Sequence, residues 1–135
     1  MSIGLPQILV LDDDAEMLHQ IAKAIAGHYR IISHTNPKYA IAALELESNI
    51  RVFVTEQVMR FGSGMDVLEA ARSMKPHVRR VMITNYSDLA SIIPGLHSGT
   101  IQALAQKPAT VPELIAAIAP ELLQQRTAQP RRLSA

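Results

Sequence analysis

Short apolar runs alternate with stretches of helical periodicity along most of this chain. The first run, Ile8–Leu11, is apolar throughout, which is typical of a strand covered on both faces. Strands that alternate with helices predict parallel pairing, because each helix carries the chain back across the sheet. The pattern therefore predicts an α/β fold with a five-stranded parallel sheet and five helices. The five runs lie at residues 8–11, 30–35, 51–56, 79–84 and 101–106.

Capping residues and prolines predict where the helices begin and end. Asp14 offers an N-cap to a first helix, and Asn36-Pro37 opens a second. Pro94 lies inside the fourth helix, where it removes a backbone donor and is expected to cause a kink. Pro120 is expected to bend or restart the fifth. The helices are expected at residues 14–27, 37–46, 65–74, from 87 or 88 to 96, and 112–118, with a loop over 60–64.

Length and composition limit the classes of protein that remain. The 135 residues fit one domain, and 48% hydrophobic with 19% charged residues is the balance of a folded protein. A net charge of +1 gives no argument for direct nucleic-acid binding. We see no signal peptide and no stretch near the ~18 apolar residues of a membrane span, so we expect a cytoplasmic protein without membrane contact. The expected parts are a flexible N-terminus (1–7), one domain (8–125) and a disordered tail or truncated linker (126–135).

Polar side chains follow four of the predicted strands. Asp12-Asp13-Asp14 follows the first, Glu56 ends the third, Thr84 ends the fourth and Lys107 follows the fifth. The carboxyl ends of parallel strands open onto one crevice, so these groups should converge. Adjacent carboxylates favour a cation, and Mg²⁺ prefers oxygen ligands. The set predicts a site for Mg²⁺ and a phosphoryl group; the alternative is that the three aspartates are only helix caps and surface charges, with Asp14 the best cap.

These motifs resemble the receiver domain of two-component response regulators, the CheY-like family. The matching segments are ILVLDDDAEML, VFVTEQVM with Gly64 eight residues after Glu56, VMIT and QKP, and the resemblance covers residues 8–125. It implies a flavodoxin-like three-layer sandwich with strand order 2-1-3-4-5. The segment TNYSDLASIIPGLHSGTIQALAQKP further resembles receivers that precede HD-GYP or transcription-activator output domains.

The resemblance also implies roles for individual residues. Asp12 and Asp13 correspond to the acids that bind Mg²⁺ in the family, with Glu56 as a third candidate ligand. Glu56 stands where an aspartate accepts a phosphoryl group from a histidine kinase or phosphotransfer protein. Thr84 and Lys107 correspond to the residues that contact the phosphate. A cation and a lysine would neutralise the charge that develops on a transferring phosphoryl group.

Glutamate at position 56 is the main departure from the family pattern. Its carboxylate lies one methylene farther out, about 1.5 Å, and a displacement of about 1 Å can slow a positioned reaction by on the order of 10²-fold. We therefore expect ordinary phosphorylation of Glu56 to fail or to be very slow. The acid could mimic part of a phosphate's charge, or it could pair with Lys107 and hold an inactive-like state; both remain open.

Three further positions depart from the family. Leu104 replaces the aromatic switch residue of the fifth strand, so the usual relay from Thr84 is expected to be absent. Arg60 replaces a proline and is expected to pair with the acids. Asn85 stands where a small residue is common and is expected to narrow the crevice. These changes favour an atypical receiver.

The function we predict is a regulatory interaction module rather than an enzyme. Its partner would be another protein, an output domain or a second copy, bound through the face formed by the fourth helix, fifth strand and fifth helix. A conventional receiver phosphorylated in the presence of Mg²⁺ is the first alternative. A Mg²⁺-dependent phosphatase or phosphotransferase with Asp12 as nucleophile is a more distant one, since Asp12 and Asp14 form an Asp-x-Asp pair.

Overall fold

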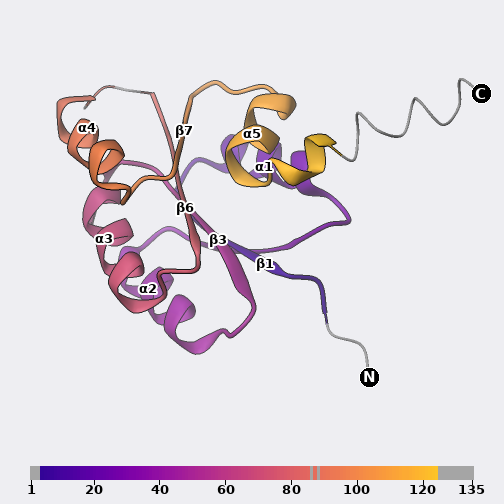
Figure 1. Cartoon of the computed structure of the whole chain (residues 1–135), viewed down its shortest axis with the longest axis horizontal. Coiled ribbons are helices and arrows are strands. Elements are labelled where there is room, and N and C mark those ends of the chain that lie inside the picture. Colours follow the sequence, from indigo (N-terminus) through magenta and orange to yellow (C-terminus); the bar gives the residue numbers. More distant parts are fainter. Residues whose placement is uncertain (1–3, 86, 88, 125–135) are drawn as a thin grey trace, which may run out of the picture.

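A five-stranded parallel sheet forms the centre of the molecule (Figure 1). The computed structural model describes residues 4–85, 87 and 89–124. The strand order is β2-β1-β3-β6-β7, which confirms the predicted order of the five runs. The sheet strands are β1 (Gln7–Leu11), β2 (Arg30–His34), β3 (Ile50–Thr55), β6 (Arg79–Thr84) and β7 (Ala103–Gln106).

Helices cover both faces of the sheet and complete the three-layer sandwich. The first and fifth helices contribute to the core on one face, and the second, third and fourth contribute to the core on the other (Figure 1). A further helical turn at residues 121–124 follows Pro120 and buries Leu122, as expected from a restarted helix. The helices are α1 (Ala15–Ile25), α2 (Pro37–Leu46), α3 (Gly64–Met74), α4 (Leu89–Ser98) and α5 (Val111–Ile118).

The all-apolar sequence of β1 is explained by its two covered faces. Ile8 and Val10 belong to the core beneath α1 and α5, whereas Leu9 and Leu11 belong to the core beneath α2, α3 and α4. All four side chains are buried. Burial of each contributes about 1.5–3 kcal/mol, so both helical layers are held to the same strand.

Side-chain caps start the helices at the places the sequence indicates. The Asp14 carboxylate accepts a hydrogen bond from the Met17 backbone N–H at 3.1 Å, which begins α1 directly after the acidic segment. The Asn36 side chain accepts from the Lys38 N–H at 2.9 Å and begins α2. Each cap satisfies one of the free N–H groups of a first helical turn.

Several predicted boundaries were wrong. Gln7, assigned to a flexible N-terminus, is buried in β1 and its N–H donates to the Asn49 carbonyl at 2.9 Å. The predicted loop at 60–64 instead holds part of a small antiparallel hairpin, β4 (Val58–Met59) and β5 (Gly62–Ser63). The third strand runs one residue earlier than predicted and the fifth begins two residues later.

The helix α4 begins later in the chain than predicted, and the predicted tail lies outside the described residues. The helix begins at Leu89 and continues through Pro94; Ser87 lies outside it, and residue 88 lies outside the described residues. The predicted tail at 126–135 and residues 1–3 also lie outside them. No helix within the described part of the chain has the length and apolar character needed to cross a membrane.

Candidate functional site

The carboxyl ends of four strands bring the predicted site residues together. The sheet ladder continues one residue beyond β1 and β3, since the Glu56 N–H donates to the Leu11 carbonyl at 3.2 Å and the Asp12 N–H to the His34 carbonyl at 3.1 Å. The Lys107 N–H likewise donates to the Thr84 carbonyl at 2.8 Å. Strand register therefore sets these residues side by side before any side chain interacts.

Lys107 lies at the centre of the acidic groups. Its Nζ is 2.9 Å from Asp12 Oδ2, 2.9 Å from Glu56 Oε2 and 3.3 Å from Asp14 Oδ2. The exposed fractions of these side chains are 16% for Lys107, 4% for Asp12, 12% for Glu56 and 39% for Asp14. The interactions with Asp12 and Glu56 are therefore shielded from water, whereas the interaction with Asp14 is at the rim.

The pKa values of Lys107, Asp12 and Asp14 are shifted by burial and by the contacts among these groups. Burial alone would lower the pKa of Lys107, but its hydrogen bonds and charge interactions with Asp12 and Glu56 outweigh this effect and raise the pKa above its usual value. Burial raises the pKa of Asp12, since the shared lysine offsets only part of the cost of desolvation. The Met17 N–H, followed by Lys107, lowers the pKa of the more exposed Asp14.

Both carboxylate oxygens of Glu56 are engaged. Oε1 accepts a hydrogen bond from the Gln57 backbone N–H at 2.7 Å, while Oε2 contacts Lys107. The Thr84 side chain is buried, but no hydrogen bond joins Thr84 to Glu56 among the described residues. Glu56 thus pairs with Lys107 in this structure, which is one of the two possibilities that the sequence left open.

Gln57, which the site prediction did not name, and Gly64 hold the segment after Glu56 in place. The Gln57 carbonyl accepts from the Gly64 N–H at 2.8 Å, and the Gln57 side chain accepts from the Met65 N–H at 2.9 Å. A Cβ at position 64 would lie 2.3 Å from the Glu56 carbonyl oxygen. Glycine is therefore required for this close approach, and its spacing from Glu56 was the available sequence signal.

Other predicted site residues lie at the rim or away from the acids. Asp13 is exposed, and its side chain makes no ion pair among the described residues. The predicted pairing of Arg60 with the acids is not made: Arg60 is exposed and its guanidinium carbon lies 6.0 Å from the centre of the Phe61 ring. Asn85 is exposed and accepts from the Ser87 N–H at 2.9 Å. Leu104 is partly buried on β7.

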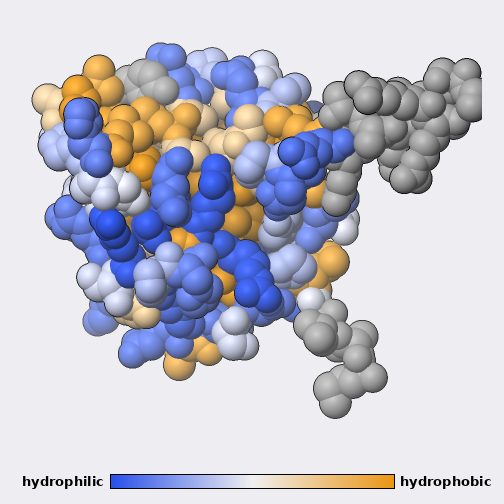
Figure 2. Space-filling view, viewed as in Figure 1, coloured by the Kyte–Doolittle hydropathy of each residue, from blue (hydrophilic) through white to orange (hydrophobic). Residues whose placement is uncertain are grey.

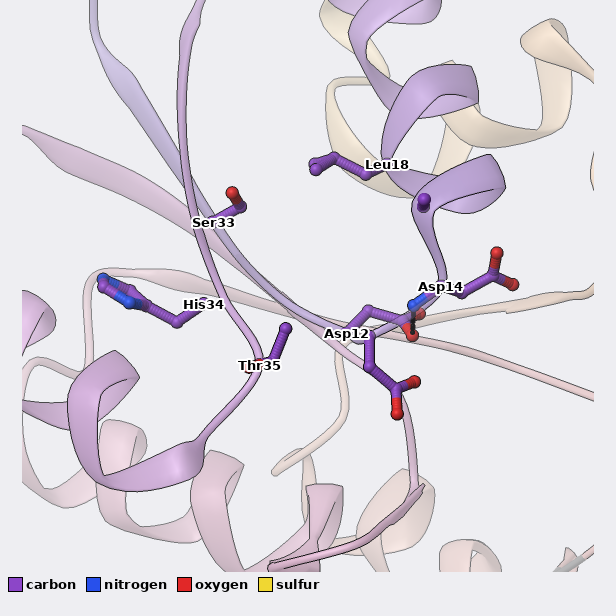
Figure 3. A pocket seen from close by; sticks show the side chains of 8 residues that line it. Asp12, Asp14, Leu18, Ser33, His34 and Thr35 are labelled. Carbon is purple, nitrogen blue, oxygen red and sulfur yellow. Dashed lines mark hydrogen bonds between the residues drawn. The ribbon is translucent and has the colours of Figure 1, made fainter.

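The acidic segment opens onto two pockets. One, of about 330 Å³, is lined by all three aspartates together with Ser33, His34 and Thr35 (Figure 3). The other, of about 390 Å³, lies toward α1 and is lined by Asp14, Asn85, Lys107 and Pro108, among others. In Figure 3 the side chain of Asp12 reaches back to the backbone of Asp14, the 3.0 Å hydrogen bond that fixes its Oδ1.

The arrangement in this structure does not fit the predicted magnesium ion. Asp12 and Glu56 would supply carboxylate oxygens, yet each of their four oxygens already accepts a hydrogen bond or contacts Lys107. No group of three acidic or histidine side chains within the described residues is placed to hold a metal ion. The oxygens are the right type of ligand, but the ammonium occupies the place between them.

Two regulatory proteins are similar in sequence to most of this chain. The photosynthetic apparatus regulatory protein RegA of Rhodovulum sulfidophilum is 28% identical over 126 residues, covering 84% of this chain and 61% of that protein. The hydrogenase transcriptional regulatory protein HoxA of Cupriavidus necator is 26% identical over 101 residues, covering 75% of this chain and 21% of that protein. The chain therefore spans about three fifths of RegA and a fifth of HoxA.

A solved structure and a family model agree with the geometry. The response regulator receiver domain protein from Clostridium thermocellum has a TM-score of 0.74 at 26% identity, with 92% of this chain and 99% of that chain covered. The family model of the response regulator receiver domain matches residues 8–119. This range contains the whole five-stranded sheet except Gln7, the first residue of β1. The chain belongs to the response regulator receiver domain family.

Proposed function

We propose that this domain is an atypical receiver whose Glu56 is not phosphorylated in the ordinary way. The observation that carries the proposal is the state of the Glu56 carboxylate, which stands at the phosphoacceptor position with one oxygen on Lys107 at 2.9 Å and the other on the Gln57 N–H at 2.7 Å. An incoming phosphoryl group would have to displace one of these contacts. The domain then acts as a regulatory module in one lasting state, not as an enzyme.

The charge on Glu56 distinguishes this state from a phosphorylated one. A carboxylate brings one negative charge, against roughly −1.5 to −2 for a phosphate monoester. Lys107 is held by this charge and by Asp12 at equal distances of 2.9 Å. The lysine position is thus maintained by the protein itself, and a phosphorylation signal is not needed to hold it.

The surface that would transmit this state lies over α4, β7 and α5. Leu89, Ile93 and Leu96 on α4 are 45%, 43% and 38% exposed, and their spacing places them on one side of the helix. Figure 2 shows apolar residues gathered over α4 and continuing toward α5. A hollow of about 500 Å³ between β7 and α5 is lined by Leu104, Ala116 and neighbouring residues of these two elements.

A partner protein or an output domain is the proposed occupant of this face, with a second copy of the chain as the alternative. Receiver domains interact with kinases and output domains. The relatives RegA and HoxA are named regulatory proteins and are longer than this chain, which supports an output domain of regulatory type. Sedimentation of wild type and Ile93→Glu would separate the two: a dimer lost in the variant indicates the second copy.

The test is intact mass after incubation with Mg²⁺ and acetyl phosphate, for wild type and Glu56→Asp. We expect no phosphoryl adduct on wild type and an adduct on the aspartate variant, since the shorter acid restores the usual acceptor. An acyl phosphate on wild type would refute the proposal and support a conventional receiver. Turnover of a generic phosphate ester, lost in Asp12→Asn, would refute it in favour of a phosphatase.

A further inference from the structure

We infer that Lys107 serves as the built-in cation of this crevice and that divalent metal and lysine compete for the same carboxylate oxygens. In this reading the domain holds its acidic cluster together without Mg²⁺. The inference deepens the proposed function, because it concerns what stabilises the same site. It stands on the positions of Lys107, Asp12 and Glu56 and on the donors that surround them.

Every carboxylate oxygen of Asp12 and Glu56 already has a partner. Asp12 Oδ1 accepts from the Asp14 N–H at 3.0 Å, and Glu56 Oε1 accepts from the Gln57 N–H at 2.7 Å. The two remaining oxygens each lie 2.9 Å from Lys107 Nζ. The main chain therefore turns both carboxylates so that their remaining oxygens face one cation, and the chain supplies that cation itself.

A metal ion cannot be added to this arrangement without opposing Lys107. Mg²⁺ binds oxygen at about 2.0–2.1 Å and demands near-octahedral geometry. An ion that bridged the same two oxygens would occupy the position of the ammonium. An ion on either oxygen alone would lie within about 5 Å of Lys107 Nζ, which is 2.9 Å from that oxygen. An ion that bridges both acids therefore requires Lys107 to leave, and an ion on one acid is opposed by the positive charge of the ammonium.

Direct binding of a metal ion differs from diffuse attraction of cations to the acidic rim in its dependence on salt. Asp12, Asp14 and Glu56 carry three negative charges against the one positive charge of Lys107, and the exposed Asp13 adds another. Cations will gather near this rim, but salt screens such attraction beyond about 8 Å at physiological ionic strength. A metal held directly by the acids would persist when monovalent salt is raised.

The experiment is a titration with Mn²⁺ followed by electron paramagnetic resonance, for wild type and Lys107→Met at physiological and at raised salt. We expect the variant to bind Mn²⁺ at least about tenfold more tightly than wild type, the change in equilibrium constant that corresponds to about 1.4 kcal/mol. Lys23→Met, which removes an exposed lysine at the end of α1, should match wild type. Equal, salt-resistant affinity of wild type and Lys107→Met would overturn the inference.

A second measurement needs no variant to fold. The unfolding temperature of wild type should rise by less than about 5 °C in millimolar Mg²⁺, since a ligand that binds weakly stabilises little. A rise of about 5 °C or more would show that the metal binds the folded wild type and would overturn the inference. The titration measures metal affinity and the mass measurement detects a covalent adduct, so this inference and the proposed function can fail separately.

Discussion

Replacement of Lys107 by methionine should lower the stability of the domain substantially. Methionine keeps much of the apolar stem, so the change removes mainly the ammonium. The carboxylates of Asp12 and Glu56 would then lie buried without their shared cation. Loss of one partner from a buried ion pair costs about 3–5 kcal/mol, whereas an exposed pair is worth about 0.2–1 kcal/mol.

The ion pairs of Lys107 are intermediate between an exposed pair and a fully buried pair, and they are closer to the buried case. Asp12 and Glu56 are buried, Asp14 is at the rim and can turn to water, and Lys107 is largely shielded. We therefore expect a loss of about 3 kcal/mol in the free energy of unfolding at neutral pH. For a domain of this size the unfolding temperature should fall by about 10 °C.

The assay is urea and thermal unfolding followed by circular dichroism, with Lys23→Met as the matched control. The control should change stability by less than about 1 kcal/mol. The deficit of Lys107→Met should shrink as the pH falls and Asp12 becomes protonated, because a neutral carboxyl needs no counter-charge. A loss no larger than that of the control would refute the view that Lys107 neutralises a buried cluster.

Three other changes test contacts elsewhere. Gly64→Ala should lower the free energy of unfolding by about 1–3 kcal/mol, since the added Cβ would clash with the Glu56 carbonyl oxygen. An unchanged midpoint of denaturant unfolding would contradict this prediction. Arg80→Met should lower the free energy of unfolding by about 2–4 kcal/mol. The buried Arg80 guanidinium donates hydrogen bonds to the backbone carbonyls of residues 76, 78, 99 and 100, and these would be lost. A loss below about 1 kcal/mol would contradict this prediction. Burial, and to a smaller extent the contact with Glu121, raises the pKa of Tyr29 to about 12. Tyr29 therefore stabilises the folded state below pH 10, and this contribution is lost as the pH rises through about 12. In an ultraviolet titration, Glu121→Gln should lower the pKa of Tyr29, while burial keeps it above 10. An unchanged pKa of Tyr29 in this variant would contradict the prediction.

The parts of the fold that follow from local patterns could be predicted from the sequence. Apolar runs such as Ile8–Leu11 identified strands because both of their faces are buried, and Asp14 identified the start of α1 because capping depends on neighbouring residues. The order of the strands followed from the family resemblance. Gln7 could not be placed, since its strand pairing depends on Asn49 and Arg30, far away in the sequence.

The site was predicted in outline but not in its contacts. Strand ends indicated that Asp12, Glu56 and Lys107 would meet, and they do. That Asp14 both caps α1 and contacts Lys107 at 3.3 Å depends on side-chain conformation, which spacing does not reveal. Arg60 was expected near the acids but lies beside Phe61, because the unpredicted β4–β5 hairpin governs its position.

The pairing of Glu56 with Lys107 is the central claim, and a double-mutant cycle tests it most directly. Unfolding free energies of wild type, Glu56→Gln, Lys107→Met and the double variant give the coupling between the two side chains. We predict a favourable coupling of about 1–3 kcal/mol that is the same with and without Mg²⁺ and acetyl phosphate. A coupling near zero, or one that disappears when the metal and the phosphoryl donor are added, would contradict the account.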